Sequence, residues 1–379
     1  MLEIISMIIK EFNYSKIKAL GIDERYLSQD QIDQITSRFS SSWKHKTIGY
    51  SVEKRPVYSW TWGQGPQKLL MWSQMHGNES TTTRGLLDLM CLLDQDTEWT
   101  RQIYSLCTIC VIPVLNPDGA HAYTRSNAAG IDLNRDAQDL SQPESILLRS
   151  LYEDWSPSFC FNLHDQRTIY NVGNDQVPAT MSFLAPAADE QLTVPEHRAK
   201  AMQVIVDINE WLQSYIPQGV GRYDDAYNIN CVGDTFQTLG TPTILFEAGH
   251  YPDDYQRTNT RALVCLSLYT AINSICFDLF VYQDIDQYLA IPQNEKKYVD
   301  VLIKNPYRIN SAWKPGQALA ITLEEKLIGG SVSWLPTTPL VVEENAFWGL
   351  KTYDVLLAQE HLLLQTKTDI WSVIQKSFN

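Results

Sequence analysis

The feature that most constrains the fold is an alternation of strand-length apolar runs with segments of helical periodicity between residues 65 and 277. Four runs rich in Val, Ile, Leu and Phe cover residues 68–75, 106–115, 158–164 and 242–247. Apolar residues recur at helical spacing in segments 80–94, 143–155, 193–215 and 261–275. Parallel strands buried on both faces have continuous apolar runs, and helices connect them. We therefore predict an α/β protein whose mostly parallel or mixed central sheet carries helices on both faces.

The segments that flank this alternation have a different character. Residues 28–40 carry a thin apolar stripe typical of a surface helix, and residues 46–62 alternate like a pair of strands. After about residue 284, strand-like stretches are separated by glycine and proline residues. We predict a helical N-terminal extension (1–44), a main domain (45–284) and a small β-rich C-terminal region (285–379), which either packs beside the functional site or extends the fold.

Composition excludes several classes of partner. The net charge of -14 and the pI near 4.9 argue against binding to nucleic acid or to an anionic membrane. No run reaches the roughly 18 apolar residues that a membrane span requires. The first ten residues are apolar but lack a basic segment and a cleavage site, and the seven cysteines form no dense framework. We expect a cytoplasmic protein with no membrane partner, and its oligomeric state is left open.

Side chains of the kind that bind metals stand at the ends of three predicted strands. His76 and Glu79 follow the first run, His164 ends the third, and Glu247 ends the fourth. A single histidine in such a position is more often a polar loop residue than a ligand. Because the carboxyl ends of parallel strands meet at one edge of a sheet, three of them together predict a site. Two histidines and a glutamate are a ligand set of catalytic zinc, whose fourth position is open.

Glu247 invites a different interpretation from the other three. The strand that it ends is otherwise apolar, and a bare carboxylate is costly to bury there. Beside a metal-bound water, the same carboxylate would serve as a general base.

Five short motifs follow one another in order along the chain: His76-x-x-Glu79, Asn116-Pro117-Asp118-Gly119, Arg125 with Gly130-x-Asp132-Leu133-Asn134-Arg135, His164, and Phe246-Glu247. In this order, over roughly residues 45–277, the chain resembles the zinc carboxypeptidases of the M14 (carboxypeptidase A-like) family. The resemblance implies one Zn²⁺ per chain, held by His76, Glu79 and His164. It also implies a water activated by the zinc, with Glu247 as its general base.

The resemblance assigns roles to residues outside the metal set as well. Arg125 would polarise the scissile carbonyl and stabilise the developing oxyanion. Asn134 and Arg135 would hold the terminal carboxylate of the substrate, Arg135 through a bidentate guanidinium. The family also carries a tyrosine on a mobile loop before the strand of the base, for which Tyr227 fits by spacing and Tyr223 is the alternative.

Two positions depart from the pattern of the family. Asn78 stands where the familiar H-x-R-E form has arginine, which removes a cation from the substrate path and puts binding at extended subsites in doubt. His164 is followed by Asp165 and Gln166 in place of the usual serine and aromatic residue, so the surroundings of the ligand are expected to differ.

The function predicted from the sequence is that of a zinc metallocarboxypeptidase, which hydrolyses the C-terminal amide bond of a peptide. The alternatives are a zinc deacylase of N-acyl amino acids and an amidase of γ-linked or cell-wall peptides. Any substrate with a free carboxylate fits Arg125 and Arg135, so these residues do not distinguish the carboxypeptidase from the deacylase or the amidase. An inactive zinc-binding module is a further alternative, against which the presence of Glu247 argues. The sequence does not predict the preferred terminal side chain.

Overall fold

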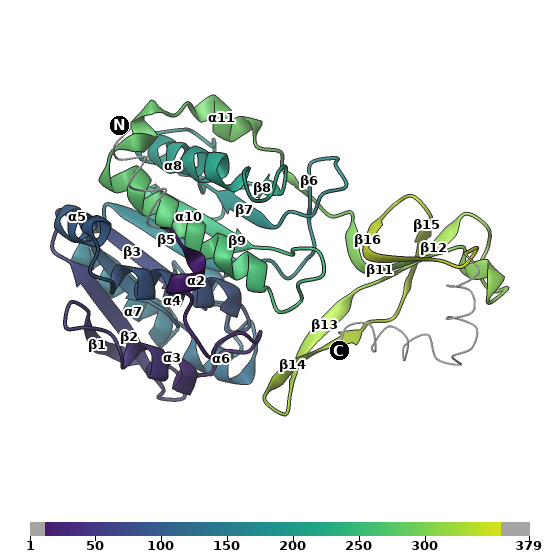
Figure 1. Ribbon diagram of the computed structural model, residues 1–379, viewed down its shortest axis with the longest axis horizontal. Helices are drawn as coiled ribbons and strands as arrows, with labels where there is room; N and C mark the ends of the chain where they lie inside the picture. The colour runs from purple at the N-terminus through teal and green to yellow at the C-terminus, as the bar shows by residue number, and fades with distance from the viewer. Residues whose placement is uncertain (1–11, 358–379) are drawn as a thin grey trace.

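The computed structural model describes residues 12–357, and the apolar segment 1–10 considered above as a targeting signal lies outside them. Its main domain is built on an eight-stranded sheet in the order β1-β2-β4-β3-β5-β9-β7-β8 (Figure 1). The strands are β1 (Lys44–Tyr50), β2 (Pro56–Gly63), β3 (Gln67–Ser73), β4 (Cys107–Ile112), β5 (Phe159–Asp165), β7 (Met181–Leu184), β8 (Val220–Arg222) and β9 (Thr243–Ala248). Strands β4, β3, β5 and β9 are parallel, whereas β1, β2 and β7 each have an antiparallel neighbour.

Both faces of the sheet are covered by helices, as the sequence predicts. The helices are α2 (Tyr14–Ile17), α3 (Gln29–Thr36), α4 (Ser80–Leu93), α5 (Glu98–Leu106), α6 (Pro117–Ala122), α7 (Pro143–Trp155), α8 (Glu196–Leu212), α9 (Val232–Thr238), α10 (Thr258–Cys276) and α11 (Ile285–Ala290). Strand β3 shows why the sequence requires two layers. Its Leu69 and Met71 pack with α4, α8 and α10, while Leu70 and Trp72 pack with α7 and α9. Residues 69–73 of the strand are all buried, on both faces, which explains its continuous apolar run.

The N-terminal segment packs against the main domain. Ile17 and Ile32 belong to the same apolar core as α4 and α10. The Tyr14 hydroxyl donates to Asp88 of α4 at 2.8 Å, and Asp88 also forms a buried ion pair of 2.6 Å with Arg261. The helices of this segment therefore contribute to the core.

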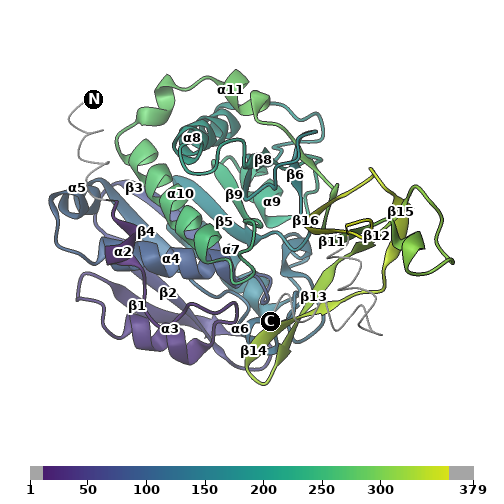
Figure 2. The same cartoon turned by 45° about the vertical axis from the view of Figure 1, so that its right-hand side comes forward.

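The C-terminal region is β-rich, as predicted. Its strands are β10 (Asn294–Glu295), β11 (Tyr298–Lys304), β12 (Gln317–Ile321), β13 (Leu323–Ile328), β14 (Ser331–Pro336), β15 (Leu340–Glu343) and β16 (Trp348–Asp354). Four of them form a separate sheet in the order β15-β12-β11-β16, and β10 pairs with β6 (Asn171–Val172) of the main domain. Strands β13 and β14 form a hairpin that reaches back towards the main domain, at the bottom of Figure 1 and in Figure 2. Its two-residue turn consists of Gly329 and Gly330, both at positive φ, as such turns require.

Residues 116–119 begin helix α6, although the sequence Asn-Pro-Asp-Gly is also typical of a turn. The Asn116 side chain accepts a hydrogen bond from the Gly119 backbone N–H at 2.8 Å, and Pro117 occupies the first helical position. Asparagine and proline favour a helix start as well as a turn.

The division of the chain at residues 44 and 284 stays a prediction. Within residues 12–357, none of the helices combines the length and apolar character that crossing a bilayer requires.

Candidate active site

The first two site residues lie where β3 gives way to α4. Gln74 adopts a positive φ of 42° directly after the strand, which turns the chain at the sheet edge. Gly77 then passes so close to α6 that a Cβ there would lie 1.9 Å from the carbonyl carbon of Gly119. This close approach holds His76 over the sheet edge, and Glu79 takes the position just before the first turn of α4.

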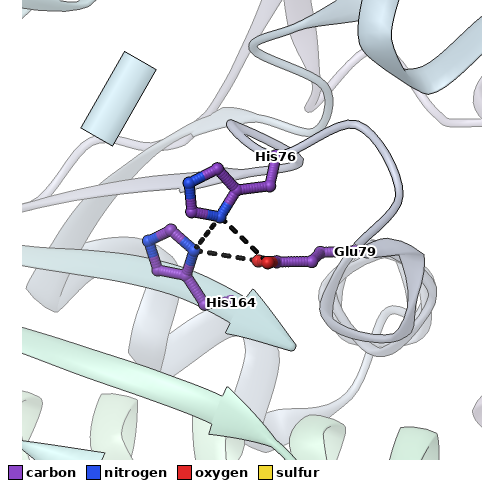
Figure 3. A group of neighbouring side chains, drawn as sticks. All are labelled: His76, Glu79 and His164. Atoms are coloured by element: carbon purple, nitrogen blue, oxygen red, sulfur yellow. Dashed lines mark hydrogen bonds and ion pairs between the residues drawn. The ribbon is translucent and has the colours of Figure 1, made fainter. Parts of the chain in front are cut away.

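The structure brings His76, Glu79 and His164 together (Figure 3). The Nδ1 atoms of the two histidines are 3.1 Å apart, and each lies 2.9 Å from an oxygen of the Glu79 carboxylate. All three side chains are buried. Donors around a tetrahedral zinc at bond lengths of about 2.0–2.2 Å are roughly 3.3–3.6 Å apart, so the donor set fits zinc closely.

Two aspartates contact these donors, one through its carboxylate and the other through its backbone N–H. Asp132 accepts from His76 Nε2 at 3.0 Å, and the Asp165 backbone N–H donates to Glu79 at 3.1 Å. Burial opposes the charged form of Asp132, but His76 and Arg125 hold the pKa of that carboxyl well below its usual range. Burial lowers the pKa of His164, which favours the neutral imidazole that a metal binds.

Glu247 is the direct neighbour of His164 across the sheet, because the two residues pair in register between β5 and β9. Its side chain is half-buried in the wall of the pocket that contains the donor set. Burial, followed by the negative charges of Glu79 and Asp165, raises the pKa of Glu247 well above its ordinary value. A carboxylate tuned upwards in this way is a stronger base near neutral pH than an exposed glutamate.

The two arginines predicted to contact substrate lie on the same pocket of about 380 Å³. Arg125 is half-exposed and donates to Asp132 at 3.0 Å and to Glu79 at 3.4 Å, so its guanidinium lies beside the donor set. Arg135 is exposed, and its Nη1 donates to the Asn134 carbonyl at 2.7 Å. Asn134 lines the pocket, and its side-chain Oδ1 accepts from the Val232 backbone N–H of α9 at 3.0 Å.

The structure separates the two candidate tyrosines. Tyr223 lines the pocket, and its ring packs edge-on against Tyr170 with the centroids 5.3 Å apart. Burial and the nearby Glu247 raise its pKa. Tyr227 is absent from the pocket wall, and its hydroxyl lies 3.3 Å from Thr238 Oγ1.

Sequence reasoning gave no role to Asp132, although the residue stands inside a quoted motif two positions before Asn134. It also missed Arg25 and Arg167. Arg25 forms a buried ion pair of 2.7 Å with Asp165, and Arg167 lines the pocket. No local pattern marks these two arginines, since their partners lie more than a hundred residues away along the chain.

Comparisons with known proteins agree with this geometry. Residues 29–199 match the zinc carboxypeptidase family. This part of the chain is therefore similar to the zinc carboxypeptidases. A stretch of 101 residues, 26% of this chain, is 30% identical to carboxypeptidase 2 of Trichophyton rubrum. That alignment spans only 19% of the length of the fungal protein.

Solved structures show the same fold. A metallo-carboxypeptidase from Burkholderia cenocepacia superposes with a TM-score of 0.55 at 17% identity, over 68% of this chain and 71% of that chain. A metallo-carboxypeptidase from Pseudomonas aeruginosa, solved in complex with (2-guanidinoethylmercapto)succinic acid, superposes with a TM-score of 0.54 at 18% identity, over 67% of this chain and 70% of that chain. The zinc carboxypeptidase family that residues 29–199 match implies that the metal is zinc.

Proposed function

We propose that the protein is a zinc metallocarboxypeptidase that releases the C-terminal residue of a peptide, with one zinc held by His76, Glu79 and His164. The observation that carries the proposal is the convergence of these three donors beside Glu247. A purely structural metal site would not require a further carboxylate on the adjacent strand, in register with His164.

Glu247 and Arg125 have different roles in the proposed hydrolysis. When bound, zinc would act as a Lewis acid on the scissile carbonyl and lower the pKa of a water to about 7. Glu247 accepts a proton from the attacking water and later donates it to the leaving amine. Arg125 stabilises the negative charge that develops on the carbonyl oxygen, because its guanidinium already lies beside Glu79.

We assign recognition of the C-terminus to two residues of loop 125–136 that line the same pocket. Arg135 and Asn134 bind the terminal carboxylate of the substrate. The contact between Asn134 and α9 orients the side-chain amide for this task. Of the two tyrosines, we assign Tyr223 as the one that contacts substrate, because it lies on the pocket wall near Glu247.

Turnover of matched substrates tests the proposal. Peptides with a free C-terminus should be hydrolysed by the zinc-loaded protein, whereas the same peptides with a C-terminal amide should be poor substrates. A series of N-acyl amino acids in the same assay separates the deacylase alternative. Hydrolysis confined to that series would contradict the peptidase assignment.

Glu247→Gln separates a catalytic role from a structural one. The amide keeps size and hydrogen bonding but cannot accept the proton, so kcat should fall by at least ~10²–10⁴-fold. Zinc content and melting temperature should barely change. Glu190→Gln, at an exposed glutamate outside the pocket, is the control. Near-native turnover by Glu247→Gln would refute the mechanism whatever the zinc analysis showed.

A further inference from the structure

Hairpin β13–β14 inserts one carboxylate into the main domain. Glu325 is buried, with 7% of its side chain exposed, and contacts the guanidinium groups of Arg25 and Arg167 and the hydroxyl of Tyr123. Its neighbours on β13 behave differently, because Glu324 and Lys326 are exposed and pair with each other at 3.2 Å. The alternation of the strand therefore directs this one glutamate inwards.

The apolar side of the hairpin fixes this contact in place. Val332 and Trp334 of β14 are buried in a small cluster with Tyr123, and Tyr255 packs edge-on against Trp334 with the ring centroids 5.7 Å apart. Glu325 is therefore held by packing as well as by charge.

Each partner of Glu325 belongs to a segment that also builds the active site. Arg25 pairs with Asp165, which is adjacent to His164 in the chain. Tyr123 precedes Arg125 by two positions, and Arg167 follows His164 by three. One carboxylate of the C-terminal region thus joins three segments whose neighbouring residues form the catalytic pocket.

Arg167 is the partner that reaches the pocket itself. It lines the pocket, and 29% of its side chain is exposed. Its guanidinium carbon lies 6.0 Å from the centre of the Tyr123 ring, so Glu325 and Tyr123 fix its position from two directions. Arg135 lines the same pocket but has other contacts, with the Asn134 carbonyl at 2.7 Å and with the nearby Cys231.

A peptide that is clamped by its terminal carboxylate at Arg135 must place its acyl part elsewhere in the pocket, which Arg167 also lines. We propose that Arg167 binds carbonyl oxygens in this acyl part and that Glu325 is a positioning residue, supplied by the C-terminal hairpin, that holds Arg167 in place. The inference rests on the proposed function.

Binding of two ligands of different length tests the inference. The ligands are an N-acetyl amino acid and an N-acetyl tetrapeptide with the same terminal residue, chosen from the turnover panel. Their affinities are measured by calorimetry on the zinc-loaded protein carrying Glu247→Gln, so that neither is consumed. Adding Arg167→Ala or Glu325→Gln should lower the affinity for the tetrapeptide by about 10-fold or more, as expected for one lost charge-assisted hydrogen bond. The N-acetyl amino acid should bind as before.

Two controls separate positioning from general damage. Glu324→Gln, one residue away and exposed, should leave both affinities unchanged. The double variant Arg167→Ala with Glu325→Gln should bind the tetrapeptide about as Arg167→Ala does, because both changes remove one interaction. Equal weakening of both ligands, unchanged tetrapeptide binding, or no binding of the tetrapeptide would each overturn the inference. Failure of the proposed function would appear separately, as tetrapeptide binding without turnover by the wild-type protein.

Discussion

At the scale of single residues, the candidate metal donors depend on partners that hold them: Asp132 accepts from His76 Nε2, and the Asp165 backbone N–H donates to Glu79. His76, Glu79 and His164 were found because strand ends on a parallel sheet share one edge, and the structure brings them within 4.8 Å of one another. Asp132 and Asp165 were not assigned, because their partners are set by the three-dimensional packing of distant segments. Contacts of that kind leave no periodic signal in the sequence.

Asp132→Asn tests the support of His76. Asp132 accepts from His76 Nε2, which fixes the ring so that Nδ1 faces the other donors. The amide is a weaker acceptor, and we expect zinc affinity to fall by roughly 10- to 100-fold, as is typical when such a partner of a ligand is lost. Competition with a chelator measures this. Asp139→Asn, an exposed aspartate four positions before Pro143, is the control and should bind zinc like the wild type.

At the scale of elements, periodicity found most of the helices and the buried strands. Helix α7 coincides with its predicted range, and α8 is shorter than the segment expected at 193–215. The short strands β7 and β8 were not predicted, since runs of three or four residues carry too little alternation. The close approach of the loop after β3 to α6 was also not predicted, because the sequence does not show which backbone atoms lie next to Gly77.

Gly77→Ala tests this close approach. The new Cβ would lie 1.9 Å from the Gly119 carbonyl carbon and 2.2 Å from the Ala120 nitrogen, so backbone must move. We expect the free energy of unfolding to fall by about 1–3 kcal/mol, as overpacking generally costs, and zinc affinity to fall with it because His76 shifts. Urea titration and zinc competition measure the two effects. At Gly233, an added Cβ would meet the Pro186 side chain at 3.0 Å, and Gly233→Ala should be milder. Equal zinc affinity in Gly77→Ala and wild type would contradict this account.

At the scale of the whole molecule, the C-terminal region is joined to the main domain by buried charge. Burial opposes the ionised form of Glu325, but Arg25, Arg167 and Arg257 hold its pKa well below the ordinary value. Asp300 of β11 lies at the same junction and accepts from the Leu323 N–H at 2.7 Å and from the Tyr255 hydroxyl at 2.8 Å. Burial, which outweighs these two hydrogen bonds, raises the pKa of Asp300 to about 6. The two carboxyls therefore respond to pH in opposite senses.

Asp300→Asn isolates one of these responses. The folded-state pKa of Asp300 is raised, so its contribution to stability is present below the unfolded value of about 3.9 and is lost as pH rises through about 6. A shift of about two pKa units corresponds to roughly 3 kcal/mol. Asparagine stays neutral, so its stability relative to wild type should improve by up to that amount between about pH 4 and pH 7.5. Urea unfolding of the metal-free proteins across this range measures the difference. Glu324→Gln, at an exposed carboxylate on β13, should show no such trend, and parallel curves for Asp300→Asn and wild type would show that the junction does not titrate in this window.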